Sequence, residues 1–173
     1  FPNGDWVVAD GYNGTRVATL DKNGKMIAQW GEKGANNNDT RPNFFNNVHG
    51  VAVDPRTLRV FVNDRGNHRV QVFDKDGKFL DQWKFGDNPS DVHLIHIFDG
   101  YLWAADRGTS KMLKYDLEGH FLYSWGTWGD FPGGFWGVHD FSTDLDGNFY
   151  ISEVDKGGVQ KFRPRAGANP AYM

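Results

Sequence analysis

Apolar and polar residues alternate along this chain in short runs, and several of these runs end at an acidic residue. In "VFVND" the apolar Val60 and Val62 lead to Asp64, and the run "LWAAD" leads in the same way to Asp106. A period of two residues is typical of a half-buried β-strand. The 3.6-residue period of an amphipathic helix is absent throughout, so the pattern predicts an all-β fold.

The alternating runs belong to an internal repeat. Three segments align along their length: "VVADGYNGTRVATLDKNGKMIAQWG", "VFVNDRGNHRVQVFDKDGKFLDQWK" and "LWAADRGTSKMLKYDLEGHFLYSWG"; a fourth, "FYISEVDKGGVQKFRPRAG", keeps the first half. The spacing of the acids is close to the roughly 40–50 residues of a four-stranded propeller blade. These acids are Asp10, Asp64, Asp106 and Glu153, which lie 54, 42 and 47 residues apart.

Each unit continues with a polar turn, a second alternating strand, an Asp-x-x-Gly hairpin turn and a last strand ending in tryptophan. A glycine that can adopt positive φ suits the hairpin. The segments "HGVAVD" and "HDFSTDLDG" read as innermost strands that line a central channel. The hairpins are Asp21 to Gly24, Asp74 to Gly77 and Asp116 to Gly119, and the tryptophans, expected to pack between blades, are Trp30, Trp83 and Trp125.

These boundaries predict a single β-propeller domain over residues 1–173, with about four four-stranded blades. We place the blades at about 1–34, 48–89, 90–135 and 136–173, and a surface loop between blades at 35–47. The four blades are expected to be part of a six-bladed ring, because residue 1 falls partway through a blade. The missing blades would come from a longer chain or from a partner chain.

Composition narrows the function classes. Aromatic residues make up 16% of the chain, and glycine occurs 22 times, as expected for many short strands joined by turns. The net charge of -3 argues against a nucleic-acid partner, and no apolar run reaches the 18 residues of a membrane span. The chain has no cysteine, which excludes disulfides and thiolate metal sites. The lack of cysteine suits a cytosol and a bacterial envelope equally, so the compartment stays open, with a secreted or bacterial-envelope location favoured.

Two histidines begin innermost strands, His49 in "VHGVAVD" and His139 in "VHDFSTD". Inner strands of a propeller start around one mouth of the channel, and alternate blades of a six-bladed ring are related by about 120°. A third histidine, expected before residue 1, would complete a zinc site with an open position. His93, in "SDVHLIHIFDG", is assigned to a different local pattern. The alternative is that both histidines are hydrogen-bonded polar residues. For the neighbouring Asp140 three roles stay open: a hydrogen-bond partner that supports His139, a ligand to another ion, or a simple turn acid.

Tyr12 and Arg65 each follow a strand-end aspartate, in "ADGYNGTR" and "NDRGNHR". A tyrosine near a cation is a reasonable proton-transfer pair, because the positive charge favours the phenolate. Arg107, in "ADRG", occupies the repeat position of Arg65. A purely structural role for Arg65 therefore stays open.

Taken together, the repeats resemble NHL repeats. The combination "ADGYNGTRV…LDKNGKMIAQWGEKG…FNNVHGVAVD…NDRGNHRVQVFDKDG" resembles the propeller of the peptidyl-α-hydroxyglycine α-amidating lyase family. The resemblance covers nearly the whole chain. It implies a six-bladed propeller, a zinc held by three histidines, and a structural calcium at the channel. It also implies cleavage of a C-terminal α-hydroxyglycine to a peptide amide and glyoxylate.

The resemblance further implies roles for individual residues. His49 and His139 would bind zinc, and the first zinc histidine of the family would fall before Phe1. Tyr12 would be the general base, and Asp140 would bind calcium. Arg65 would be the cation that stabilises the Tyr12 phenolate or, alternatively, would hold the substrate carboxylate. Arg107 is then expected to be a repeat residue without a part in the site.

Three functions follow as hypotheses. The first is a zinc lyase acting on a small-molecule or peptide substrate, and the second is a non-catalytic NHL propeller that binds a protein or peptide. The third is a related propeller hydrolase of the lactonase type, which would use carboxylate and asparagine clusters around calcium. The histidines at the strand starts favour zinc over the third. Gly137 stands where the lyase family has a methionine two residues before the last zinc histidine.

Overall fold

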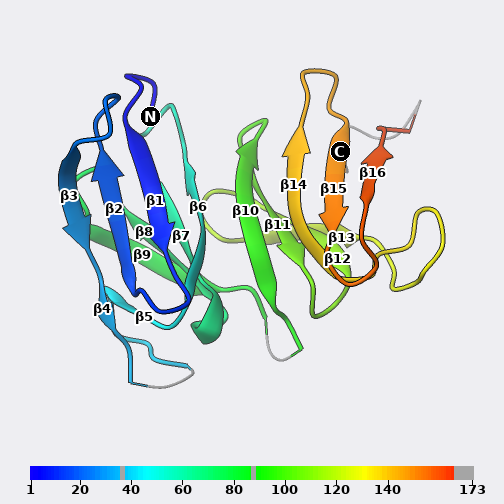
Figure 1. Ribbon diagram of the computed structural model, residues 1–173, viewed down its shortest axis with the longest axis horizontal. Helices are drawn as coiled ribbons and strands as arrows, with labels where there is room; N and C mark the ends of the chain where they lie inside the picture. The colour runs from blue at the N-terminus through cyan, green and yellow to red at the C-terminus, as the bar shows by residue number, and fades with distance from the viewer. Residues whose placement is uncertain (36–37, 87–88, 166–173) are drawn as a thin grey trace. The chain divides into compact units, whose positions relative to one another are not determined.

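The computed structural model describes residues 1–35, 38–86 and 89–165, and its strands form five sheets (Figure 1). The predicted all-β fold is confirmed. Residues 36–37 of the expected loop, 87–88 of the second expected blade and 166–173 of the fourth lie outside the described residues. The chain divides into two compact units, Phe1–Ser90 and Asp91–Met173. Within the described ranges, no helix has the length and hydropathy that a membrane crossing requires.

The first unit holds a three-stranded and a four-stranded antiparallel sheet with a short parallel strand pair along the connection between them. The first sheet has the order β1 (Trp6–Asp10), β2 (Arg16–Leu20), β3 (Met26–Trp30); the short pair is β4 (Glu32–Lys33) and β5 (Phe44–Phe45). The second sheet has the order β6 (Val48–Val53), β7 (Val60–Asp64), β8 (Arg69–Phe73), β9 (Phe79–Lys84), with the 3₁₀-helix η1 (Arg65–Asn67) between β7 and β8.

The second unit repeats this meander twice. Its four-stranded sheet has the order β10 (Val92–Phe98), β11 (Tyr101–Asp106), β12 (Lys111–Tyr115), β13 (Phe121–Trp125). Its three-stranded sheet has the order β14 (Val138–Thr143), β15 (Phe149–Glu153), β16 (Val159–Phe162).

The hairpin turns form as the sequence predicts. In each, the aspartate side chain accepts the backbone N–H groups of the residues two and four positions on, and the glycine has positive φ. A fourth turn of this kind, which the repeat alignment missed, runs from Asp144 to Gly147. The aspartate thus satisfies two backbone donors that the tight turn leaves without a strand partner.

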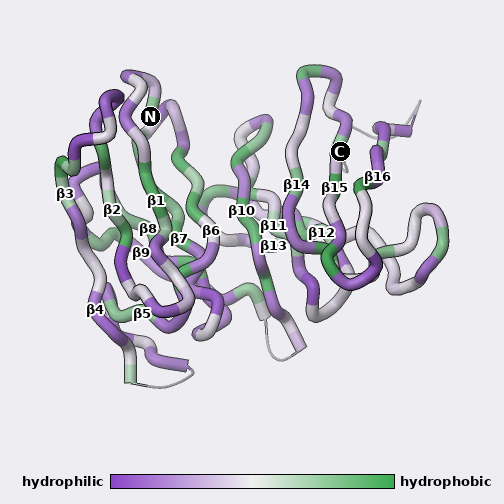
Figure 2. The backbone as a smooth tube through the Cα atoms, viewed as in Figure 1, coloured by the Kyte–Doolittle hydropathy of each residue, from purple (hydrophilic) through white to green (hydrophobic). Residues whose placement is uncertain are grey.

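Aromatic and aliphatic side chains fill the space between successive sheets of each unit, and Figure 2 shows apolar stretches interspersed with polar ones along the chain. Trp30 of the first sheet lies with its ring centroid 5.6 Å from that of Phe73 of the second. Trp125 lies in the same way 5.0 Å from Phe162. Phe45 is fully buried in the first unit's core, so the segment 35–47 is not wholly the surface loop that the sequence suggested.

A buried carboxylate in three of the sheets ties down the chain just ahead of the innermost strand. The acid stands at the end of the second strand of its sheet. One of its carboxylate oxygens accepts a hydrogen bond from a backbone N–H that lies one or two residues before the innermost strand begins. Since buried carboxylates must be hydrogen-bonded, this contact explains why the repeat keeps an acid there. The pairs are Asp64 with the N–H of Asn46 at 2.8 Å, Asp106 with Asp91 at 2.7 Å, and Glu153 with Trp136 at 2.7 Å.

Replacement of Asp64 by alanine should therefore destabilise the fold strongly. Asp64 also pairs with Arg69 at 2.7 Å, and both side chains are almost fully buried. Removing one partner of a buried ion pair leaves an uncompensated charge and costs about 3–5 kcal/mol. Urea denaturation of Asp64→Ala and wild-type protein measures this loss.

Asp10 provides the matched control, because it occupies the same repeat position. It pairs with Arg16 at the same 2.7 Å, but both side chains are more than two-fifths exposed. An exposed pair contributes about 0–1 kcal/mol, so Asp10→Ala should be nearly neutral. Equal losses in the two variants would contradict the importance of the buried contact.

Candidate functional site

A β-bulge falls at the same place in three sheets, and each bulge carries a histidine. In each sheet a valine of the innermost strand pairs with the strand-end acid, after which the innermost strand has one extra residue. A bulge re-aims the side chains that it contains and often lies beside a functional site. The valines are Val48, Val92 and Val138, and the residues that follow them are His49, His93 and His139.

His93 is therefore the structural equivalent of His49 and His139. Assigning it to a different local pattern was wrong, because the strand register and not the following residue defines the equivalence. The signal was present in the sequence as a valine-histidine pair ahead of Asp64, Asp106 and Glu153.

In the first unit, the Tyr12 side chain contacts His49. The Tyr12 Oη lies 3.2 Å from Nε2 of His49, and the two rings meet edge to face with centroids 5.5 Å apart. Tyr12 is 71% exposed, while His49 is half-buried. The pair thus presents a phenol oxygen to solvent beside an imidazole nitrogen.

The backbone of the Tyr12 turn makes this contact possible. Tyr12 has φ of 56°, a left-handed conformation that a residue with a side chain adopts only when its surroundings hold it. Its N–H donates to Oδ1 of Asn47 at 3.0 Å. A Cβ on Gly11 would lie 1.6 Å from the carbonyl oxygen of Val48, so only glycine fits there.

Arg65 stands on a turn that rests against the same segment. It begins η1, and the next residue, Gly66, donates its N–H to the carbonyl of Asn46 at 2.7 Å. A Cβ on Gly66 would come within 2.6 Å of that same oxygen. Both turns therefore dock on residues 46–48, the segment that leads directly into His49.

In the second unit, His93 and His139 lie side by side on β10 and β14, two strands that contact each other. Their ring centroids are 4.5 Å apart, and their nearest ligand nitrogens lie within 4.8 Å. His93 is 5% exposed, and its Nε2 is 3.1 Å from Oδ2 of Asp91. Two imidazoles at this separation can share a transition-metal ion after a small adjustment of their rings.

Asp140 follows His139 in the bulge, and its carboxylate is exposed. Its backbone carbonyl accepts a hydrogen bond from the Ser152 hydroxyl at 3.2 Å. Burial lowers the pKa of His96 on the neighbouring strand, and the charge of Asp140 opposes that shift. Asp140 is therefore close enough to His96 to act on its charge.

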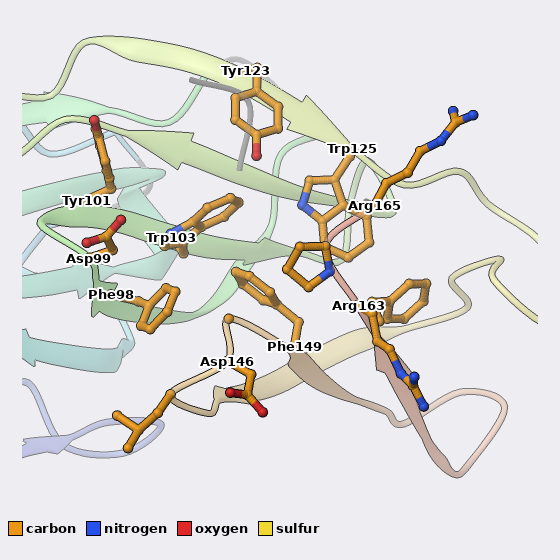
Figure 3. Close-up of a pocket in the computed structure, with 14 residues that line it drawn as sticks. Phe98, Asp99, Tyr101, Trp103, Tyr123, Trp125, Asp146, Phe149, Arg163 and Arg165 are labelled. Atoms are coloured by element: carbon orange, nitrogen blue, oxygen red, sulfur yellow. The ribbon is translucent and has the colours of Figure 1, made fainter. Parts of the chain in front are cut away.

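The second unit also has an aromatic pocket of about 680 Å³ (Figure 3). Tyr123, Trp125 and Phe149 face it, while Arg163 and Arg165 stand at its outer side with their guanidinium groups directed away. Burial raises the pKa of Tyr123 to about 12, so its phenol stays neutral near pH 7. The pocket lies at the hairpin ends of β10 and β14, opposite the ends that carry His93 and His139.

Comparison with known proteins identifies relatives. Residues 45–73 match the NHL repeat family model. Peptidyl-glycine alpha-amidating monooxygenase A of Xenopus laevis is 30% identical over 168 aligned positions, and the alignment covers 93% of this chain and 18% of that protein. Peptidyl-alpha-hydroxyglycine alpha-amidating lyase 1 of Drosophila melanogaster is 27% identical, over 99% of this chain and 35% of its own length. Human NHL repeat-containing protein 3 is 41% identical over 63% of this chain and 31% of its own length. The chain thus spans about a third or less of these relatives.

Solved structures agree on the fold. A catalytically inactive virginiamycin B lyase from Staphylococcus aureus has a TM-score of 0.63 at 13% identity, over 94% of this chain and 53% of its own. Hydrazine synthase of Kuenenia stuttgartiensis has a TM-score of 0.67 at 15% identity, over 94% of this chain and 44% of its own. These likenesses support the β-propeller class.

Gly11→Ala should destabilise the protein and separate Tyr12 from His49. The new methyl group overlaps the Val48 carbonyl, and overpacking of this kind costs about 1–3 kcal/mol. Asn13→Ala, an exposed position of the same turn, should change the free energy of unfolding by less than about 0.5 kcal/mol. Urea denaturation measures the stabilities, and the imidazole NMR signals of His49 report the lost contact. A Gly11→Ala protein with wild-type stability and an unchanged His49 signal would refute the close approach.

Proposed function

Because the chain contains an NHL repeat and resembles amidating lyases over most of its length, we propose that it carries a zinc-dependent carbon–nitrogen lyase site. The substrate would be a peptide or small molecule ending in an α-hydroxyglycine, and the products an amide and glyoxylate. The contact between the Tyr12 phenol and Nε2 of His49 is the observation that carries this proposal. It puts a group able to take a proton beside a group able to bind a metal.

The donor chemistry of the site fits zinc. His49 and His139 offer imidazole nitrogens from equivalent bulges, and imidazole is a preferred zinc ligand. The resemblance assigns a further histidine to a blade outside residues 1–173. When bound, zinc would act as a Lewis acid that makes the substrate's α-hydroxyl more acidic.

The residues of the chain would then move the proton. Tyr12, as phenolate, takes the proton of the α-hydroxyl, and the positive charge of Arg65 stabilises that phenolate. The oxygen becomes the aldehyde oxygen of glyoxylate as the C–N bond breaks. The electron pair of that bond leaves with the amide nitrogen, which receives a proton back from Tyr12. The exposure of Tyr12 leaves room for the substrate to approach.

Calcium is proposed as a structural ion, with Asp140 as one of its ligands. A carboxylate oxygen is the ligand type that calcium prefers, and Asp140 is exposed at the start of β14. The charge of the ion would hold the bulge that contains His139.

A second candidate function is a propeller that binds a peptide without chemical change. The chain's similarity to human NHL repeat-containing protein 3, at 41% identity over 116 aligned positions, fits this candidate as well as the first. Glyoxylate release by the full-length protein separates the two candidates.

Tyr12→Phe should lower kcat on an α-hydroxyglycine peptide by on the order of 10²–10⁴-fold, the contribution of a general base. The ring and its packing on His49 remain, so zinc content and melting temperature should not change. Tyr150→Phe is the control, because its hydroxyl donates to Asp144 within the hairpin that joins β14 and β15 and has no part in the proposed site. Glyoxylate release gives the rate, and undiminished turnover by Tyr12→Phe would remove Tyr12 as the base.

His49→Ala should lower the zinc content of the purified full-length protein from about one ion per propeller. Loss of one imidazole ligand weakens a zinc site severely. His120→Ala, at an exposed hairpin, should leave the zinc content unchanged. Elemental analysis of freshly purified protein is the measurement, and wild-type protein without zinc would end the zinc proposal.

A further inference from the structure

His93 and His139 stand on equivalent bulges of the second unit, and their imidazole rings are in contact. Their rings meet at 64° with centroids 4.5 Å apart, and both stand one residue after the valine that pairs with a strand-end acid. The lyase site needs His139 and assigns nothing to His93. The equivalence of the two bulges raises the question of what a second imidazole does there.

The carboxylate of Asp91 sets the tautomer of His93. Its Oδ2 lies 3.1 Å from Nε2 of His93. A carboxylate is only an acceptor, so Nε2 carries the proton and Nδ1 carries the lone pair. Metal-binding histidines commonly donate their other ring nitrogen to a carboxylate in this way.

Asp91 is itself held from two sides. Its backbone N–H donates to Asp106, which fixes the start of β10. Its side chain faces Arg107, whose Nη1 is 4.0 Å from Oδ2. Arg107 also forms a two-pronged pair with Asp155, with three N–H···O contacts between 2.8 and 3.1 Å. Arg107 therefore links two sheets of the second unit. Its position in the repeat did not predict this link.

The ion pair between Arg107 and Asp155 also touches the segment that leads to His139, because the Asp155 carboxylate lies against Gly137. The Asp155 carboxylate occupies the place of a side chain at residue 137, because a Cβ there would lie 2.4 Å from Oδ2. Gly137 has φ of 77°, and its carbonyl accepts the N–H of Val154 at 2.8 Å. The Asp155 carboxylate, held by Arg107, thus lies where the side chain of the lyase family's methionine would begin.

We propose that His93 is a metal ligand in this protein. It binds through Nδ1 to the same divalent ion as His139, and Asp91, Arg107 and Asp155 are positioning residues for the pair. The ion is of the class that imidazole favours, with zinc or cobalt as examples. The inference rests on the proposed metal site, but it does not depend on the lyase reaction.

The test is the affinity of the full-length protein for zinc, measured by competition with a chelating dye. His93→Ala should lower the affinity at least tenfold, and Asp91→Asn should lower it by about 10–100-fold, as loss of a supporting hydrogen bond does. His96→Ala, on the same strand with its ring against Phe141, should leave it unchanged. Wild-type affinity in His93→Ala would overturn the proposal.

Should His93→Ala fail to fold, ¹⁵N NMR of the histidines in the unaltered protein answers the same question. Zinc should shift Nδ1 of His93 while its Nε2 stays protonated, and it should shift one nitrogen of His139. A zinc-dependent shift of His139 alone would overturn the assignment.

The two proposals can fail separately. Zinc binding that needs His93, in a protein that releases no glyoxylate, would remove the lyase reaction and leave this inference intact. Glyoxylate release with zinc affinity independent of His93 would do the reverse.

Discussion

A single hydrogen bond, from the backbone N–H ahead of an innermost strand to a buried strand-end carboxylate, fixes the geometry on which the candidate site depends. It occurs with Asp64, Asp106 and Glu153, although the last side chain is one methylene longer. Each carboxylate accepts further donors, so it is well satisfied in the core. Because the contact sets where the innermost strand begins, it also sets where the bulge and its histidine fall.

The four antiparallel sheets differ in the turn that follows the strand-end acid. In three sheets the left-handed residue stands four positions after the acid, at His68, Ser110 and Gly157. In the first sheet it stands two positions after Asp10, at Tyr12. That shift brings the phenol to His49, and the strained backbone is held by the Gly11 and Asn47 contacts. The turn of the first sheet thus differs from the other three, and the difference places a phenol beside an imidazole.

The sequence alone predicts those features of the structure that depend on residues close together in the chain. Alternating strands and Asp-x-x-Gly hairpins are local, so the all-β fold and the turns could be predicted. The equivalence of His93 could not be read from its following residues, because it depends on pairing with Asp106 across a hairpin. The Arg107–Asp155 pair joins residues 48 positions apart, and the burial of Phe45 depends on packing against strands distant in sequence. Neither leaves a local pattern.

The central claim is that histidines placed by these bulges hold a metal ion. X-ray absorption spectroscopy at the zinc edge of the zinc-loaded full-length protein tests it most directly. The account predicts zinc–nitrogen distances of about 2.0–2.1 Å with the multiple-scattering pattern of at least two imidazole rings. A first shell of oxygen ligands without an imidazole pattern would contradict it.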